Sequence, residues 1–451
     1  MKRQLVATLL VLIALPAFAA SAPGAGIAAL LTHADAGLGF ARPELLRRMA
    51  HRSRARRRRL LSSQATEADR PVHAGLGAGA GGSIVTNEYL VHLSVGTPPR
   101  PVALTLDTGS DLVWTQCAPC LDCFDQGMPL LDPARSSTYA ALPCDAPLCR
   151  ALPFTSCGGG GGSGGSWGER SCVYVYHYGD KSLTVGQLAA DRFTFGDADG
   201  HSERRVTFGC GHFNKGIFQA NETGIAGFGR GRWSLPSQLG VTSFSYCFTS
   251  MFESKSSLVT LGAAAELQSG HVFQSTPLIK DPSQPSLYFL SLKGISVGSK
   301  RLPVPERRLR STIIDSGASI TTLPEDVYEA VKAEFVAQVG LPVIGAEAGA
   351  ALDLCFALPA TAPFWRRRGR RAVAVPSLTL HLDGADWELP RGNYVFEDHG
   401  ARVMCLVLDA AAGEQTVIGN YQQQNTHVVY DLGRDVLSFA PARCDELVAS
   451  V

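Results

Sequence analysis

The 451-residue sequence predicts an all-β protein built from two similar lobes. Two short stretches nearly repeat each other, Leu104–Ser110 (LTLDTGS) and Thr312–Ala318 (TIIDSGA). In each, an apolar strand ends at an Asp, and a small hydroxyl residue and a Gly follow, which permit a sharp turn. The chain also contains 47 Gly and 26 Pro between short runs of Val, Leu, Thr and Phe, a composition typical of β structure with many turns. Its length exceeds that of one ordinary domain.

The repeated stretches place one acidic residue in each lobe, Asp107 and Asp315. If the lobes are duplicates, the two carboxylates meet at the seam between them. Neighbouring carboxylates cannot both ionise easily, so one keeps a proton and acts as an acid while the other acts as a base on water. A second pair of similar segments, Ile225–Gly227 and Val417–Gly419, supports the duplication. We expect each to pair with the strand that carries the Asp.

The amino-terminal region has the features of segments that are removed during maturation. Lys2 and Arg3 precede the apolar run Leu5–Phe18 and a group of small residues, which predicts a secretory signal peptide at 1–22. Residues 23–80 lack a strand pattern and are interpreted as a pro-segment and linker. We expect an amino-terminal lobe at 81–250 and a carboxyl-terminal lobe at 251–451. No later apolar stretch is long enough to span a membrane, and no anchor signal is expected.

The charge is unevenly distributed along the chain. Residues 1–70 contain 12 basic and four acidic residues, whereas the remainder contains 29 basic and 36 acidic ones. The basic cluster 52–59 could be read as a nucleic-acid patch. In a secreted chain we prefer a removable pro-segment that pairs with an acidic enzyme and is released when carboxylates become protonated. We therefore expect no nucleic-acid partner.

Local patterns predict two ordered elements clearly. Apolar and polar residues alternate over Glu88–Val95, as in a half-buried strand. Apolar residues recur at three- and four-residue steps over Pro324–Val339, and Gly340 follows, which predicts a helix. Other helices are expected to be few and short.

Twelve cysteines lie between positions 117 and 444. An even number in a secreted chain indicates up to six disulfides, although spacing alone does not give their connectivity. The alternative is a zinc site at Cys117, Cys120 and Cys123, but no partner pair follows at finger spacing. We expect neither a metal nor an organic cofactor.

With these motifs taken together, the chain resembles the pepsin-type aspartic proteases, and within them the plant nepenthesin-like branch, which carries a Cys-rich insertion after the first Asp motif. The resemblance covers about residues 84–446. It rests on eight motifs: Val95–Pro99, Leu106–Trp114, Tyr178–Asp180, Phe208–Cys210, Gly227–Arg230, Phe244–Phe248, Ile313–Gly317 and Ile418–Gln423.

The resemblance implies a bilobal pepsin-like fold with two β-barrel-like lobes and an active-site cleft between them. Asp107 and Asp315 would be the catalytic pair. Tyr178 would lie at the tip of a hairpin flap that closes over an extended peptide, with Trp114 beneath it. The remaining implied site residues are Gly109 and Gly317 at the substrate, and Thr108, Ser110 and Ser316 in support. A strand-core aromatic is the alternative for Tyr178, and the turn that follows it favours the flap.

The resemblance also implies a connectivity for the cysteines. The expected disulfides are Cys117–Cys120, Cys123–Cys210, Cys144–Cys172, Cys149–Cys157, Cys247–Cys444 and Cys355–Cys405.

Ala318 and Asn221 carry two further signals. Relatives usually carry Thr or Ser three places after the second Asp, where this chain has Ala318. A hydroxyl donor favours the ionised carboxylate, so its absence predicts a less acidic pH optimum. Asn221 begins the acceptor pattern Asn221–Thr223 and is the expected N-glycosylation site.

These patterns predict a secreted aspartic endopeptidase, made as a zymogen and inhibited by its own pro-segment. We expect a monomer that acts on peptides or proteins, with a preference for bulky apolar residues at the scissile bond, in the apoplast or the vacuole. The principal alternative is a non-proteolytic binding or inhibitor protein on the same fold. A glycosidase also uses two carboxylates but sets them apart across a sugar. A serine hydrolase finds no support, because the Gly-Gly-Ser-Gly-Gly stretch within Gly160–Gly165 lies in a low-complexity run without the strand that the Gly-x-Ser-x-Gly motif requires.

Overall fold

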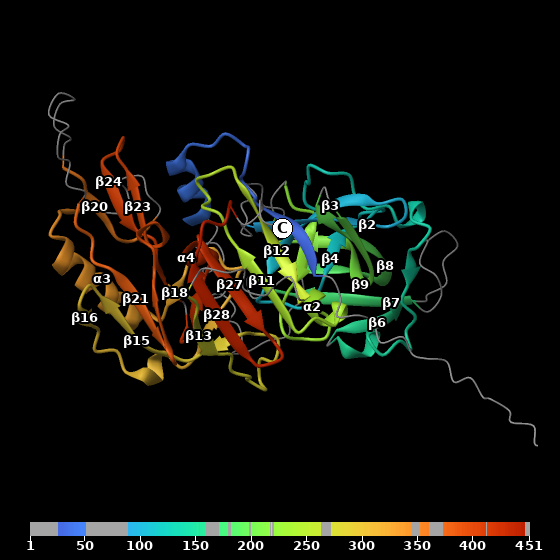
Figure 1. Ribbon diagram of the computed structural model, residues 1–451. Coiled ribbons are helices and arrows are strands. Elements are labelled where there is room, and N and C mark those ends of the chain that lie inside the picture. The colour runs from blue at the N-terminus through green and yellow to red at the C-terminus, as the bar shows by residue number, and fades with distance from the viewer. Residues whose placement is uncertain are drawn as a thin grey trace, which may run out of the picture.

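A computed structural model describes most of the chain, and it is an all-β fold with few short helices (Figure 1). The described residues are 26–50, 89–152, 154–158, 171–178, 182–197, 200–216, 218, 221–262, 272–344, 352–359, 373–411 and 413–446. The predicted signal peptide and the basic cluster 52–59 lie outside them. Residues 42–50 are helical, and the other α-helices of the described part are α2 (Leu235–Leu239), α3 (Glu325–Val339) and α4 (Asn420–Gln423).

The largest sheet contains strands from both ends of the chain and extends into both halves of the molecule. In Figure 1, β27 (Thr426–Asp431) and β28 (Val436–Pro441), drawn in red, lie between the green and the orange elements. In spatial order the strands are β13 (Gln274–Pro277), β28 (Val436–Pro441), β27 (Thr426–Asp431), β11 (Ser243–Cys247), β12 (Ser256–Leu261), β1 (Ile27–His33), β2 (Tyr89–Val95), β3 (Arg100–Asp107), β10 (Gly224–Gly227), β4 (Trp114–Gln116), β9 (Gly200–Lys215), β8 (Leu183–Asp197), β7 (Ser171–His177) and β6 (Thr155–Gly158), with β5 (Ala140–Ala141) paired to β8.

The predicted duplication is present in the strand order. The second half has its own five-stranded sheet: β14 (Phe289–Leu290), β17 (Thr312–Ile314), β26 (Thr416–Ile418), β18 (Thr322–Leu323) and β25 (Asp409–Ala410). It matches the run β2-β3-β10-β4-β9 of the large sheet. In both runs the second and third strands are parallel, the third and fourth antiparallel, and the fourth and fifth parallel. The two motif strands, β3 and β17, therefore occupy equivalent places.

Two further sheets and one helix complete the second lobe. One sheet has the order β16 (Lys300–Arg301), β15 (Leu292–Val297), β21 (Leu378–Leu382) and β22 (Ala385–Glu388). The other has the order β19 (Val343–Ile344), β20 (Cys355–Ala357), β24 (Val403–Leu406) and β23 (Val395–Asp398). Helix α3 confirms the predicted helix. It buries Val327, Val331 and Phe335, and it ends at Gly340, whose φ of 64° favours glycine.

The expectation that residues 23–80 lack a strand is wrong. Residues Ile27–His33 form β1, which lies between β2 and β12 and pairs antiparallel with both. Its residues alternate between buried and partly buried positions. The sequence, IAALLTH, has few β-branched residues, so local propensity does not mark it as a strand. The free edges of β2 and β12 supply the hydrogen bonds that make it one.

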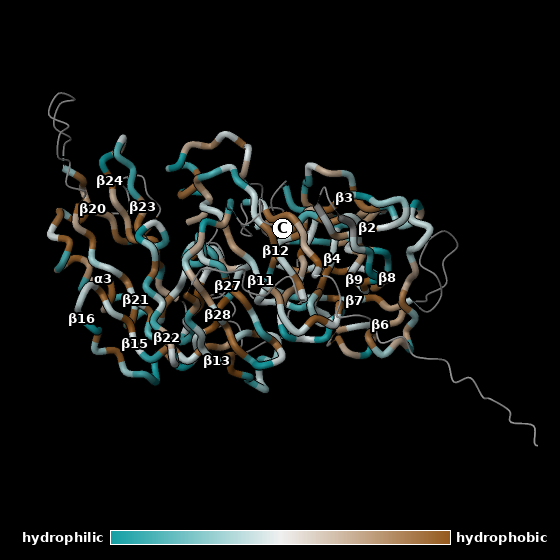
Figure 2. Tube along the Cα trace, in the orientation of Figure 1, coloured by the Kyte–Doolittle hydropathy of each residue, from teal (hydrophilic) through white to brown (hydrophobic). Residues whose placement is uncertain are grey.

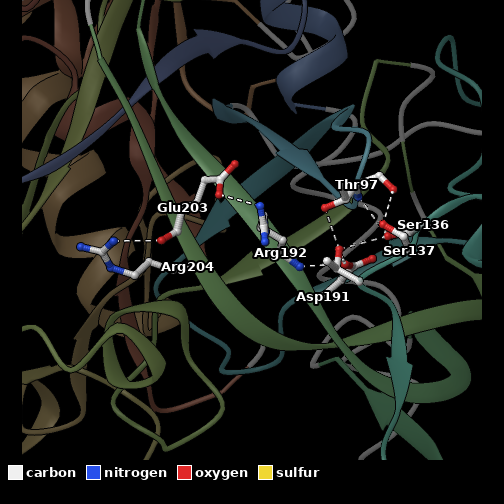
Figure 3. A network of polar contacts seen from close by, with 8 residues as sticks. Thr97, Ser136, Ser137, Asp191, Arg192, Glu203 and Arg204 are labelled. Carbon is white, nitrogen blue, oxygen red and sulfur yellow. Dashed lines mark hydrogen bonds and ion pairs between the residues drawn. The ribbon is translucent and has the colours of Figure 1, made fainter.

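The turn that leads into β3 is fixed by a polar network (Figure 3). The backbone N–H of Thr97 donates to Ser136 Oγ at 3.0 Å. Thr97 Oγ1 lies 2.9 Å from Thr138 Oγ1, and Thr138 Oγ1 donates at 2.6 Å to Oδ1 of the buried Asp191. Gly96 has a φ of 93°, which favours glycine, and a Cβ there would lie 2.9 Å from Ser136 Oγ. The network holds the start of β3 in place.

Six disulfides form, and four of the expected pairs are corrected. Cys247–Cys444 and Cys355–Cys405 are the pairs that the resemblance implies. The expected pairs Cys117–Cys120, Cys123–Cys210, Cys144–Cys172 and Cys149–Cys157 do not occur. They are replaced by Cys117–Cys210, Cys120–Cys123, Cys144–Cys157 and Cys149–Cys172.

The strand register explains this change. Strand β4 runs parallel to β9 with Thr115 opposite Cys210, and this brings Cys117 to a Cα–Cα distance of 5.3 Å from Cys210. Cys149 and Cys172 are both buried in one apolar cluster and bond there, whereas Cys157 is exposed.

One extensive apolar core runs through both lobes, and Figure 2 shows apolar segments along many of the labelled strands. Within the described ranges, no helix is both long and apolar enough to cross a membrane.

Candidate active site

The two motif aspartates occupy equivalent positions on equivalent strands. Asp107 is the last residue of β3, where it lies opposite Gly227 of the parallel strand β10. Asp315 directly follows β17, and its N–H donates to Ile418 O of β26 at 3.1 Å. Both residues are buried, with 3% and 8% of their surface exposed. The pairing that the sequence predicted beneath each Asp is therefore present.

Each carboxylate is oriented by the turn that follows it. The N–H of Gly109 donates to Asp107 Oδ1 at 2.9 Å, and the N–H of Gly317 donates to Asp315 Oδ1 at 2.8 Å. Ser110 Oγ donates to Asp107 Oδ2 at 2.5 Å. These bonds fix the direction of both side chains.

The space around the two glycines shows that the carboxylates converge. A Cβ at Gly109 would lie 2.7 Å from both carboxylate oxygens of Asp315. A Cβ at Gly317 would lie 2.2 Å from Asp107 Oδ1 and 3.2 Å from Asp315 Oδ1. Each glycine thus lies against the carboxylate of the opposite lobe, and any side chain there would displace it.

The hydroxyl residues of the two motifs join the lobes. The N–H of Thr108 donates to Ser316 Oγ at 3.0 Å, and the N–H of Ser316 donates to Thr108 Oγ1 at 2.9 Å. Ser316 Oγ also donates to Leu106 O at 2.9 Å. This reciprocal pair is buried and holds the two Asp turns together.

Tyr178 lies at the tip of the hairpin formed by β7 and β8. Its N–H donates to Ser182 O at 2.8 Å, which closes the turn. The indole N–H of the fully buried Trp114 donates to Tyr178 Oη at 2.6 Å. Burial, and then the neighbouring Tyr176 and Asp107, raise the pKa of Tyr178 well above its usual value. Tyr178 therefore lies near the first carboxylate, and its role in a flap stays a prediction.

The two half-sites differ in one hydroxyl donor to the carboxylate. Ser110 donates a hydroxyl hydrogen bond to Asp107, whereas the equivalent Ala318 has no hydroxyl to donate to Asp315. Ala318 is buried, with 8% of its surface exposed. The missing hydroxyl is visible when the two motif sequences are compared, and the structure places it next to the Asp315 carboxylate.

Some supporting contacts were not found from the sequence. Asn420 Nδ2 donates to Ser316 O at 3.0 Å, and Gln423 Nε2 lies 3.4 Å from Asp315 O. Tyr246 Oη in turn donates to Gln423 Oε1 at 2.6 Å. Asn420 and Gln423 belong to the motif Ile418–Gln423, in which polar residues directly follow an apolar strand. That polar run was the only signal in the sequence that these side chains support the site.

The side chain of Asn221, the predicted glycosylation site, makes a hydrogen bond within the fold. Asn221 Nδ2 donates to Ala34 O, just after β1, at 2.6 Å. Glu222 is fully buried, and Thr223 is buried and bonded to Ala103. Glycosylation of Asn221 stays a prediction.

The described residues contain no cluster of three or more metal-ligating side chains. The polar groups at the seam are two carboxylates with hydroxyl and backbone donors around them. Such a set can hold a water molecule and exchange protons with it.

Comparisons with known proteins agree with this geometry. The family models described as "Xylanase inhibitor N-terminal" and "Xylanase inhibitor C-terminal" match residues 89–263 and 287–441. Aspartic proteinase nepenthesin-1 from Nepenthes gracilis is 37% identical over 93% of this chain and 90% of its own length. The chain belongs to the nepenthesin-like branch of the pepsin-type aspartic proteases. It is an aspartic-type endopeptidase.

Two further relatives extend the comparison. Nepenthesin-2 from the same plant is 35% identical over 94% of this protease and 91% of its own chain. The crystal structure of basic 7S globulin from soybean matches with a TM-score of 0.63, covering 80% of this protease and 95% of that chain at 20% identity. That likeness shows the shared bilobal fold.

Proposed function

We propose that this protease is secreted as a zymogen and that Asp107 and Asp315 hydrolyse the peptide bond. The observation that carries this assignment is the approach of the two turns, in which the glycine of each motif lies against the carboxylate of the other. Two carboxyl groups held at one seam share a proton and can hold one water between them.

The hydrogen bonds suggest a division of roles. Asp107 accepts a backbone N–H and a hydroxyl, and both favour its ionised form. Asp315 lacks the equivalent hydroxyl donor and is assigned the proton. The ionised carboxylate takes a proton from the water as its oxygen attacks the peptide carbonyl. The protonated one donates a hydrogen bond to the developing oxyanion, and a proton finally reaches the leaving nitrogen.

The turn of the β7–β8 hairpin covers the bound substrate. Tyr178 and Trp114 hold each other through one hydrogen bond at the side of Asp107. A flap at this place excludes water and keeps a peptide extended against the strands. A preference for bulky apolar residues at the scissile bond is part of the proposal.

The amino-terminal segment supports the zymogen. Strand β1 is inserted between β2 and β12, and Asn221 binds the turn after it. The helical residues 42–50 pack Leu46 and Met49 into a cluster with residues of the second lobe, among them Phe396 and Tyr421. A segment that contacts both lobes can restrict access between them, and we propose that it inhibits the enzyme until it is removed.

The remaining features of the proposal follow from the sequence. The predicted signal peptide directs the chain to the apoplast or the vacuole, and the mature enzyme acts as a monomer on peptides or proteins. The alternative is a binding or inhibitor protein on the same fold, which the names of the two matching family models suggest. The complete pair of half-sites favours the enzyme.

The deciding experiment uses the processed protein and a denatured protein substrate between pH 2 and pH 7. We expect cleavage in acid that Asp107→Asn and Asp315→Asn each abolish while the variants remain folded. Absence of cleavage at every pH would overturn the proposal and favour the binding protein. Comparing full-length protein with protein lacking residues 1–80 tests the zymogen, because only the shorter form should cleave without prior processing.

A further inference from the structure

Four residues after Asp107, a second carboxylate lies buried in the same turn. Asp111 is 8% exposed. Its Oδ1 accepts the N–H of Gly231 at 2.9 Å, and its Oδ2 accepts the hydroxyl of Ser286. The two donors come from segments far apart in the chain, so this one side chain joins three segments.

A run of alternating glycines makes room for this carboxylate. A Cβ at Gly229 would lie 2.3 Å from Asp111 Oδ1, and one at Gly231 would lie 1.9 Å from Oδ2. The N–H of Gly229 also donates to Ser110 O at 2.8 Å, and that of Phe228 to Asp107 O at 2.7 Å. The segment 227–231 is therefore bound along its length to the turn that carries Asp107.

The third segment leads to the other aspartate. Ser286 O accepts the N–H of Arg230 at 2.9 Å. Two residues later, Tyr288 donates its hydroxyl to Phe228 O at 2.9 Å, and its carbonyl accepts the N–H of Ile314 at 3.1 Å. Ile314 is the last residue of β17, directly before Asp315. A short path of hydrogen bonds thus connects the two aspartate strands through Asp111 and Ser286.

The Asp111 turn also contacts the flap hairpin. The backbone N–H of Asp111 donates to Tyr176 Oη at 3.3 Å. The ring of Tyr176 lies edge-on to that of Tyr178, with 5.2 Å between centroids. The same turn therefore touches both lobes and the hairpin.

We infer that Asp111 is a positioning residue, whose carboxylate fixes the separation and orientation of the two aspartate turns. The inference rests on the proposed roles of Asp107 and Asp315. The reciprocal contact of Thr108 and Ser316 joins the turns at one place. The hydrogen bond from Ser286 to Asp111 attaches the first turn at a second place, to the segment that leads to β17. Displacements of about 1 Å in a reacting geometry can cost roughly 100-fold in rate.

The hydrogen bonds of Asp111 also define its conservative replacement. An Asn can accept from the Gly231 N–H with its oxygen and donate with its amide to Ser286 Oγ, once the hydroxyl rotates. It preserves both attachments without the charge. An Ala preserves neither, and Ser286→Ala removes one.

The test compares Asp111→Ala, Asp111→Asn and Ser286→Ala on an extended peptide, well below each melting temperature. Asp281→Ala is the matched control, because Asp281 accepts from Ser283 in a similar way but is only partly buried. We expect Asp111→Ala to lower kcat about 10- to 100-fold with little change in KM. Ser286→Ala should show a smaller loss, Asp111→Asn should restore kcat to within about threefold, and the control should match wild type.

A second readout does not depend on catalysis. Hydrogen exchange at the amides of Arg230 and Gly231 should accelerate in Asp111→Ala and Ser286→Ala but not in the control, while the β8–β9 hairpin stays protected. If Asp111→Ala does not fold, Ser286→Ala and Asp111→Asn decide. If wild type cleaves and the folded Asp111→Ala and Ser286→Ala variants keep its kcat, the inference is overturned. If wild type does not cleave, the proposed function fails. Unchanged hydrogen exchange in Asp111→Ala and Ser286→Ala would separately overturn the positioning role of Asp111.

Discussion

Replacing Ala318 with Ser tests how the unequal half-sites set the pH range of the enzyme. The change adds one hydroxyl at the position equivalent to Ser110, which donates to Asp107 at 2.5 Å. Because the two turns are equivalent in strand order and in their backbone contacts, the new hydroxyl should reach the Asp315 carboxylate. The native Ala318 is buried, so water does not readily replace this donor.

The size of the effect follows from the hydrogen bond added. A hydrogen bond to a charged group contributes about 1.5–3 kcal/mol, and about 1.4 kcal/mol corresponds to one pH unit of a titration. Asp315 is the carboxyl assigned the proton, so a donor that favours its ionised form should move the alkaline limb of the activity profile to lower pH. Part of the gain is lost because the pair shares one charge, and we expect a shift of about one pH unit.

The assay is the pH dependence of kcat/KM for a peptide substrate, measured for wild type and Ala318→Ser. Ser110→Ala removes the existing hydroxyl and should shift the profile in the opposite direction. Superimposable profiles for wild type and Ala318→Ser would refute the reasoning. A shift of the Ala318→Ser profile to higher pH would show that the predicted direction is wrong.

Three further predictions concern the fold. Tyr178→Phe removes the acceptor of the buried Trp114 N–H and should lower both kcat/KM and the free energy of unfolding, the latter by about 1–3 kcal/mol; an unchanged melting curve would show that the indole finds another acceptor. Replacing Cys117 and Cys210 with Ser opens a loop of 93 residues and should cost about 4–5 kcal/mol in urea unfolding, and a loss below about 1 kcal/mol would contradict the chain-entropy argument. Phe335→Ala leaves a cavity under α3 and should cost about 3–5 kcal/mol in the same measurement, whereas a near-neutral result would mean that the helix repacks.

Much of the fold was predictable because its signals are local. Helix α3 has an apolar period, a proline at its start and a glycine at its end, and all three lie within one short segment. The repeated Asp motifs likewise indicated a duplication. Strand β1 could not be predicted in this way, since its pairing energy comes from β2 and β12, which lie far away in the sequence.

The disulfides show the same limit. The resemblance implied a bond between Cys117 and Cys120, but the parallel register of β4 and β9 brings Cys117 next to Cys210 instead. Asp111 is a further example. Its position after the first motif was visible, but its partners Gly231 and Ser286 converge on it only after folding.

The sequence by itself determined that two Asp–hydroxyl–Gly turns exist, that they are related by duplication and that the second lacks a hydroxyl at Ala318. These are properties of short segments, and they follow from local strand and turn preferences. Only the tertiary structure decided which groups meet: the glycine of each turn with the opposite carboxylate, and Asp111 with the segment leading to Asp315. Such contacts depend on the register and packing of distant strands, and local sequence preferences do not contain that information.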